Sequence, residues 1–349
     1  MKAQNLGQQR RSVGLILATL LGLWAGAPAT ADGPDAEASL RQLFRRPSTL
    51  PATPDKQLAP EKVALGAVLF SDQRLSGGGR HSCASCHQPE LAFTDGRRQP
   101  RTLTGTRMKR NAPTLWNLAW SRLFFWDGRA SSLEEQVRMP IEARDEMAGN
   151  WEVILNHLNA DPATSARFVN AFPGQSVITD VLVVQALAAY VRSLVSPRTR
   201  FDAWIEGDVS ALSPAELSGF RLFTGKAGCM LCHVGWRFTD DKFHDIGLPG
   251  KDPGRSAVPG GTPGRTAFKT PTLRELSSTA PYMHDGSMPS LEAVLRHYSG
   301  GFVRRPTLAP NMRRDLRLSP RERIDLIAFL LTLSSEKPGT SAARKAPSR

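Results

Sequence analysis

The pentapeptide CASCH at residues 83–87 returns as CMLCH at residues 229–233. Two thiols with two residues between them, and a histidine directly after the second, allow a haem to form two thioether bonds while the imidazole of the same turn reaches the iron. A zinc site would need four converging ligands, and a redox-active dithiol has no use for the trailing histidine. The sequence therefore predicts two covalently attached c-type haems.

The two motifs together use all four cysteines of the chain. No thiol then remains for a disulfide, even in an oxidising compartment where disulfides would persist. The predicted thioether positions are Cys83, Cys86, Cys229 and Cys232, and the predicted iron ligands are His87 and His233.

Residues 1–31 have the features of a secretory signal peptide. Three cations precede an apolar run at 13–25, and the small residues at 29–31 offer a cleavage site. The run is too short to anchor the mature chain in a bilayer. These features predict a periplasmic protein without a membrane span, and the pair Arg10-Arg11 leaves twin-arginine export open as a second route.

The formal net charge is +13, which falls to about +10 when the signal-peptide cations are removed. A basic surface can steer an acidic protein partner or keep a protein soluble, and both interpretations stay open. No basic stripe with interleaved aromatic residues points to nucleic acid, so nucleic-acid binding is not expected.

Two similar units follow the signal peptide. A proline opens a predicted helix at Pro60 before the first motif, and Ser213 and Pro214 cap a predicted helix before the second. This repeat favours duplication of a cytochrome c module. The predicted organisation is an extended lead-in at 32–57, an N-terminal cytochrome c domain at 58–210, a C-terminal cytochrome c domain at 211–335 and a disordered tail at 336–349.

The rest of the chain also has a helical pattern, and no stretch alternates as a strand. We expect a short helix that begins near Ser132 and that Pro140 terminates, and a core helix at 181–195. The Gly- and Pro-rich segment 239–281 is typical of loops around a haem. The remaining expected helices are 151–158, 290–298 and a last helix from Pro320 that packs on the second haem through Ile324, Ile327, Phe329 and Leu330. The predicted fold class is mostly α, with two cytochrome c-like domains.

Several stretches resemble the bacterial dihaem cytochrome c peroxidases, in the order and spacing of that family. They are LGAVLF, SCASCH, RNAPTLWN, FFWDGRASSLEEQ, GKAGCMLCH, TPTLREL, TAPYMHDGS and IDLIAFLLTL. The resemblance covers nearly the whole mature chain. It implies a haem-dependent oxidoreductase in which the N-terminal haem reacts with hydrogen peroxide and the C-terminal haem transfers electrons.

The resemblance also assigns roles to individual residues. It implies that Trp126 relays electrons between the haems, and that Gln136 and Glu146 lie over the peroxide site. A carboxylate there can move a proton between the peroxide oxygens while a neutral amide orients the molecule. Without the resemblance, these residues would be ordinary helix and core positions. A calcium site between the domains is implied at Asn111 and the carbonyls of Thr279 and Pro281, oxygen donors that suit this cation.

The chain departs from ordinary members of the family at two positions. The removable histidine ligand of the first haem is replaced by Leu103, which implies an open iron. The methionine ligand of the second haem is replaced by Tyr298, whose oxygen favours ferric and higher states, whereas a thioether favours ferrous iron. Other interpretations are that Tyr298 is only packed in the core, or that Met283, Met288 or His297 binds the iron.

Leu103 and Tyr298 at these two positions, together with the segment FHDIGLP at 243–249, resemble a branch of the family that oxidises a protein substrate. The implied function is completion of tryptophan tryptophylquinone in the methylamine dehydrogenase small-subunit precursor, part of methylamine metabolism. That branch has an exit tryptophan where this chain has Ala227, so Trp236 or Trp204 would have to replace it. The alternatives are a peroxidase that takes electrons from a small cytochrome c or cupredoxin, and a non-enzymatic electron carrier.

Overall fold

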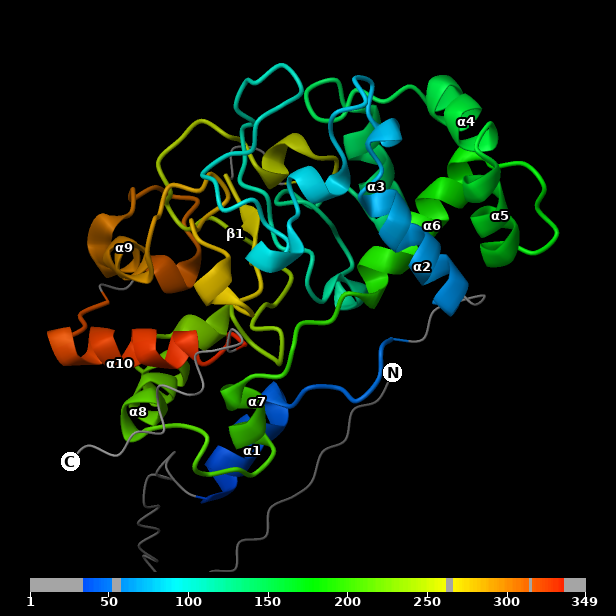
Figure 1. Cartoon of the computed structure of the whole chain (residues 1–349). Helices are drawn as coiled ribbons and strands as arrows, with labels where there is room; N and C mark the ends of the chain where they lie inside the picture. Colours follow the sequence, from blue (N-terminus) through cyan, green and yellow to red (C-terminus); the bar gives the residue numbers. More distant parts are fainter. Residues whose placement is uncertain (1–33, 52–57, 262–265, 314–315, 336–349) are drawn as a thin grey trace, which may run out of the picture.

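Short helices joined by long loops form most of the chain (Figure 1). The computed structural model describes residues 34–51, 58–261, 266–313 and 316–335, and the predicted signal peptide and tail lie outside these ranges. Within them, no helix is both long and apolar enough to cross a membrane. The helices are α1 (Pro34–Phe44), α2 (Pro60–Phe70), α3 (Leu133–Glu142), α4 (Trp151–Asn159), α5 (Pro162–Ala171), α6 (Asp180–Ser193), α7 (Arg200–Ile205), α8 (Pro214–Thr224), α9 (Leu291–Arg296) and α10 (Pro320–Leu331).

The expected mostly α class is confirmed by this architecture. Two strands of two residues each, β1 (Phe243–His244) and β2 (Phe268–Lys269), pair antiparallel inside the long loop region after the second motif. Figure 1 shows α2 to α6 gathered in one half of the molecule and α7 to α10 in the other, with the loops between them. The predicted helix starts at Pro60, Pro214 and Pro320 are confirmed.

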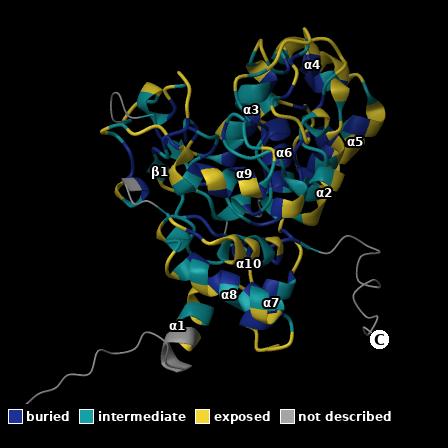
Figure 2. Ribbon diagram, turned by 90° about the vertical axis from the view of Figure 1, so that its left-hand side faces the viewer, coloured by how far each residue is buried: buried dark blue, intermediate teal, exposed yellow. Residues whose placement is uncertain are grey.

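The first half packs around the crossing of α2 and α6. α6 is the apolar helix expected at 181–195, and it is buried on most of its surface, whereas α4 and α5 are exposed along their outer side (Figure 2). Gly66 lies where the two helices meet. A Cβ at this position would lie 2.7 Å from the Cβ of Tyr190 and would overlap the Ala186 carbonyl, so the crossing brings the backbones into contact.

The second half repeats this arrangement with α8 and α10. Gly219 lies at the crossing, where a Cβ would overlap the Asp325 carbonyl and lie 2.6 Å from the Cβ of Phe329. An aromatic cluster fills the core beside it, with ring centroids mostly 5 to 6 Å apart. Two crossings of the same kind, each before a haem motif, support the predicted duplication. The members of the cluster are Phe44, Phe201, Phe220, Phe223, Phe238 and Phe329.

The predicted extended lead-in at 32–57 is wrong over its first part, because Pro34–Phe44 form α1. The Phe44 side chain is fully buried and lies against Phe238 and Phe201, with ring centroids 4.9 and 6.1 Å away. A helix this short is marginal by itself and depends on such tertiary packing. The Pro- and Ala-rich composition gave no sign of that packing. Residues 52–57 lie outside the described ranges.

The two halves have separate hydrophobic cores. The first core draws on residues 65–194, and the second draws on Phe44 and residues 201–333. The predicted boundary at 210/211 assigns α7 to the first domain, whereas Phe201 and Trp204 of α7 pack in the second core. This packing favours a boundary between residues 194 and 201, and the division into two domains stays a prediction.

Two helix predictions are corrected by the structure. Pro140 does not terminate α3, which continues to Glu142. A proline in the last turn removes only one hydrogen bond of the helix, so the helix continues past it. Ile324 does not pack inward from α10, because it is 61% exposed, whereas Phe329 and Leu330 are buried as expected.

We expect Gly219→Ala to lower the free energy of unfolding by about 1 to 3 kcal/mol, because the added methyl group meets the α10 backbone, which cannot move away as a flexible side chain could. Urea unfolding followed by far-UV circular dichroism measures this loss. Arg221→Ala, at an exposed position of the same helix, is the control and should change stability by less than about 0.5 kcal/mol. Equal stability of the two variants would contradict a backbone contact at Gly219.

Candidate functional site

Both CxxCH motifs adopt the same local structure. In each motif a 3-10 helix begins at the first cysteine: η2 (Cys83–Ser85) in the first motif and η5 (Cys229–Leu231) in the second. In each motif the histidine backbone N–H donates to the carbonyl of the first cysteine, over 3.0 Å in the first motif and 2.9 Å in the second. The turn therefore brings both thiols and the imidazole of a motif to one side.

Each motif histidine is held by a main-chain carbonyl. His87 Nδ1 lies 2.9 Å from the Phe93 carbonyl oxygen, and His233 Nδ1 lies 2.8 Å from the Phe238 carbonyl oxygen. Because a carbonyl can only accept, Nδ1 carries the proton in both rings. Burial lowers the pKa of both imidazoles. Each ring is thus neutral and has Nε2 left as a metal ligand, as a haem iron requires.

A cavity of about 1270 Å³ lies between the two halves and is lined by both motifs. Burial raises the pKa of Cys83 and Cys229 to about 12 and the pKa of Cys86 to about 11. Neutral thiols beside a large, mostly apolar space, with a neutral imidazole in each motif, match the needs of two covalent haems. The residues present therefore fit the predicted groups.

The residues assigned to the peroxide site, Gln136 and Glu146, line this cavity together with the predicted electron relay Trp126. Gln136 extends from α3, and Glu146 lies in the loop that follows it. Burial raises the pKa of the Glu146 carboxyl, and the positive charge of Arg129 opposes that rise. The indole Nε1 of Trp126 donates to the Asn111 carbonyl over 2.9 Å, which fixes the ring at the cavity wall.

The predicted ligand Tyr298 lines the second half of the cavity. Burial raises the pKa of its phenol, and the thiols of Cys229 and Cys232 add to this effect. A buried phenolate with no cation beside it is therefore disfavoured. The alternatives differ in position: His297 Nε2 lies 2.9 Å from the Ile246 carbonyl oxygen and does not line the cavity, while Met283 does.

Two further observations concern the alternative ligands. Met288 does not line the cavity, whereas Met312, which the sequence analysis missed, does. The position of Met312 at the cavity could not be predicted from its spacing to the motifs, because only the folded loop after α9 brings this residue to the cavity. Leu103 lies in a loop outside the lining residues, so it does not cap the first half of the cavity.

The proposed calcium ligands also lie at the cavity. Asn111, Thr279 and Pro281 all line it. The Asn111 side-chain nitrogen donates to the Arg97 carbonyl over 2.9 Å, which leaves the amide oxygen as an acceptor. The Asn111 backbone N–H donates to the His284 carbonyl over 2.8 Å. This position therefore joins the two halves of the molecule.

Charged groups fix the loop that carries Trp126. Arg110 lies 2.5 Å from Asp127 of this loop and 2.8 Å from Asp252 of the second half. Lys269 donates from Nζ to the Leu123 carbonyl over 2.9 Å and from its backbone N–H to the Trp126 carbonyl over 2.8 Å. Burial lowers the pKa of Lys269 to about 8. Trp126 is thus held by contacts from both halves.

Comparison with known proteins gives these features a context. The model of the family described as di-haem cytochrome c peroxidase matches residues 60–210. The chain is 49% identical over 314 residues to the methylamine utilization protein MauG of Methylorubrum extorquens, covering 89% of each chain. It is 43% identical over 297 residues to MauG of Methylophilus methylotrophus, covering 84% of this chain and 88% of that protein.

The chain belongs to the MauG-type dihaem cytochrome c peroxidase family.

A solved structure agrees with this assignment. The crystal structure of a MauG-like protein associated with microbial copper homeostasis superposes with a TM-score of 0.72 at 32% identity, covering 84% of this chain and 93% of that chain. Membership of the family makes the protein a haem-dependent oxidoreductase and implies two haem c groups. The resemblance stated from the sequence is confirmed.

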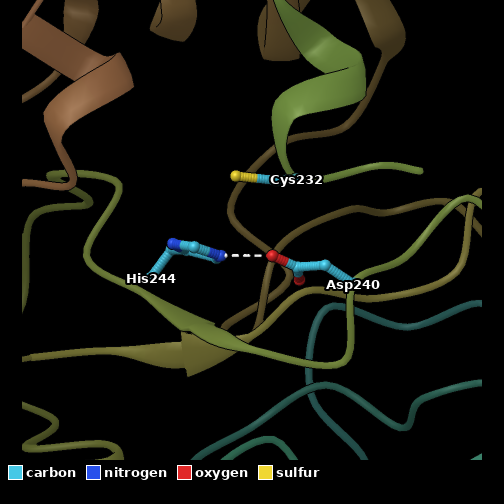
Figure 3. A group of neighbouring side chains, drawn as sticks. All are labelled: Cys232, Asp240 and His244. Carbon is cyan, nitrogen blue, oxygen red and sulfur yellow. Dashed lines mark hydrogen bonds and ion pairs between the residues drawn. The ribbon is translucent and has the colours of Figure 1, made fainter.

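Cys232, Asp240 and His244 form a trio of potential metal ligands that was not predicted from the sequence. Asp240 Oδ2 lies 2.8 Å from His244 Nε2, and the sulfur of Cys232 lies near both (Figure 3). Asp240 raises the pKa of His244 to about 9, with a smaller effect of Cys232. Cys232 is one of the predicted thioether positions, so the trio lies beside the predicted second haem site. Only His244 of the trio could have been noticed in the sequence, because it lies in the segment FHDIGLP at 243–249.

Proposed function

We propose that the chain is a periplasmic, MauG-like oxidoreductase that uses hydrogen peroxide to oxidise tryptophans of the methylamine dehydrogenase small-subunit precursor. The product would be the tryptophan tryptophylquinone cofactor of methylamine metabolism. The observation that carries this proposal is the buried phenol of Tyr298 in the second half of the cavity. The high identity to two proteins named for methylamine utilization supports it.

The haems would be held by the residues of the two motifs. Cys83, Cys86, Cys229 and Cys232 would form the thioethers, and the Nε2 atoms of His87 and His233 would bind iron. Bound haem c would supply the redox-active iron that gives two electrons to peroxide and later regains them from the protein that is oxidised. Tyr298 would supply the sixth ligand of the second iron, because a ferric ion is the nearby cation that a buried phenolate requires.

Glu146 and Gln136 would handle hydrogen peroxide in the first half of the cavity. The Glu146 carboxylate would take a proton from one peroxide oxygen and return it to the other, so that the outer oxygen can leave as water. The elevated pKa of this buried carboxyl makes it a stronger base than an exposed glutamate. The neutral amide of Gln136 would orient the peroxide without competing for the proton.

Trp126 and the calcium ligands would connect the two domains. Trp126 lies at the cavity wall and is held by hydrogen bonds to both halves, as an electron relay between fixed haems requires. Asn111, Thr279 and Pro281 would bind calcium through oxygen atoms, with water completing the coordination. A cation there would strengthen the contact between the domains proposed at 58–210 and 211–335.

A second candidate function is a peroxidase that reduces hydrogen peroxide with electrons from a small cytochrome c or cupredoxin. The observation that favours it is Ala227, where the quinone-forming branch has its exit tryptophan. The two candidates for a replacement both lie against cations: Arg41 is 4.2 Å from the Trp204 ring, and Arg46 is 5.2 Å from the Trp236 ring. A neighbouring cation makes an indole harder to oxidise.

One assay separates these two functions. We expect hydrogen peroxide and the purified enzyme to convert the methylamine dehydrogenase precursor to its quinone form, seen as visible absorbance that needs both peroxide and enzyme. Rapid steady oxidation of reduced cytochrome c by peroxide, without quinone formation, would establish the peroxidase instead.

We expect Tyr298→Phe to change the electron paramagnetic resonance spectrum of the second ferric haem, because the phenol oxygen is removed from the iron. Tyr282→Phe is the matched control, since Tyr282 also lines the cavity but donates its hydroxyl to the Leu276 carbonyl over 2.9 Å. The spectrum of the control should stay as in the wild type. If Tyr298→Phe also leaves the spectrum unchanged, another residue binds this iron.

We expect Glu146→Gln to slow the reaction with hydrogen peroxide by about 10² to 10⁴-fold, the usual effect of losing a general base. Stopped-flow absorbance after mixing with peroxide measures the rate. Glu152→Gln, which makes the same change at an exposed glutamate of α4 outside the cavity lining, should keep a rate close to that of the wild type. A normal rate in Glu146→Gln would refute the proton-transfer role.

A further inference from the structure

An unusually basic loop lies next to the cavity. Between Asp95 and Asp127 the sequence contains no acidic residue. Within this stretch, residues 97–109 form a hairpin-like loop, here called the basic hairpin. Five of its side chains are cationic and exposed: Arg97, Arg98, Arg101, Arg107 and Lys109.

Hydrogen bonds hold the basic hairpin in a defined shape. Thr102 donates from its backbone N–H to the Thr106 carbonyl over 2.8 Å, and Met108 donates to the Pro100 carbonyl over 2.8 Å. The hydroxyls of Thr102, Thr104 and Thr106 lie 2.7 to 3.2 Å from one another. The cations are therefore displayed on a preorganised loop, which lowers the entropic cost of binding.

The charges of the basic hairpin are poorly compensated within the chain. Arg101 and Arg107 face each other across the two arms of the loop, and like charges in directly opposed positions are destabilising. Arg98 lies 3.9 Å from Asp285. In the part of the chain that the structure describes, the side chains of Arg107 and Lys109 have no carboxylate partner, whereas the charge of Arg97 acts on the carboxyl of Asp95. A set of carboxylates from outside would relieve this repulsion.

The position of the loop connects it to the site. Arg101 and Lys109 line the edge of the cavity, whereas Arg97, Arg98 and Arg107 do not. Carboxylates of bound haems could reach the first two cations, but the other three are exposed and lie outside the cavity lining. The loop thus has more exposed cations than the haem site can neutralise.

We propose that the basic hairpin is the docking surface for an acidic face of the protein that exchanges electrons with this enzyme. This rests on the proposed function only in that the electrons come from a protein. Complementary charge would steer the partner to the edge of the cavity and orient it there. The contact would weaken as salt increases, because these side chains are exposed and screened.

Poly-L-glutamate serves as the probe, with binding to the full-length holoenzyme measured by calorimetry at low and physiological salt. The triple variant Arg97→Gln, Arg98→Gln, Arg107→Gln should bind at least about ten-fold more weakly than the wild type at low salt. The control triple Arg144→Gln, Arg167→Gln, Arg221→Gln removes the same charge from exposed positions outside the loop and should keep the wild-type affinity.

Several results would overturn the proposal. Equal loss in both triple variants would mean that net charge alone attracts the probe. No loss in the first would mean that these three exposed cations do not bind it. Tighter binding of a DNA duplex or of phosphatidylglycerol vesicles, with the same dependence on the loop, would assign the surface to another class of partner. These outcomes do not involve peroxide, so they are independent of the quinone assay.

A single substitution separates docking from a structural role. Arg107→Glu would place an acid opposite Arg101, so the melting temperature should rise slightly while poly-L-glutamate binding weakens. A loop that serves only the fold would show a higher melting temperature with unchanged binding, and that result would refute the docking role.

Discussion

The hydrogen bond between each motif histidine and a main-chain carbonyl is the interaction on which the candidate site depends. It places the proton on Nδ1 of His87 and of His233 and leaves Nε2 for a metal. The carbonyls come from Phe93 and Phe238, residues with a positive φ five or six positions beyond the histidine. The loop after each motif must therefore fold back before the histidine can be a competent ligand, and this couples local backbone shape to cofactor chemistry.

The two halves share this scaffold but differ in what faces the cavity. Each half has a glycine at a close helix crossing, Gly66 or Gly219, and a motif histidine held in the same way. The first half then presents a carboxyl and an amide, whereas the second presents the phenol of Tyr298. A duplicated module can therefore serve two roles, because the same scaffold carries different side chains at the cavity in its two halves.

Much of the fold and site could be predicted from the sequence, since local signals determine them. The CxxCH spacing and the Ser-Pro caps of α8 and α10 depend on residues within a few positions of one another. Two of the predictions that were wrong, the extended lead-in and the domain boundary, depend on distant contacts. The helix α1 is stabilised by Phe44 in the second core, and α7 packs with residues far along the chain. Asp240 and His244 likewise approach Cys232 only because of how the loop folds (Figure 3). The same is true of Arg107, which the loop places opposite Arg101.

The burial of Tyr298 determines what its phenol can do. An exposed tyrosine near a haem would stay a neutral phenol at neutral pH and would gain little from the metal. In this cavity, burial raises the pKa of the phenol further, so the hydroxyl can lose its proton only where a strong positive charge replaces the lost hydration. A ferric ion meets that need and a ferrous ion meets it less well. Ligation by this residue would therefore make the second haem hard to reduce to the ferrous state, and would make oxidation above the ferric state easier.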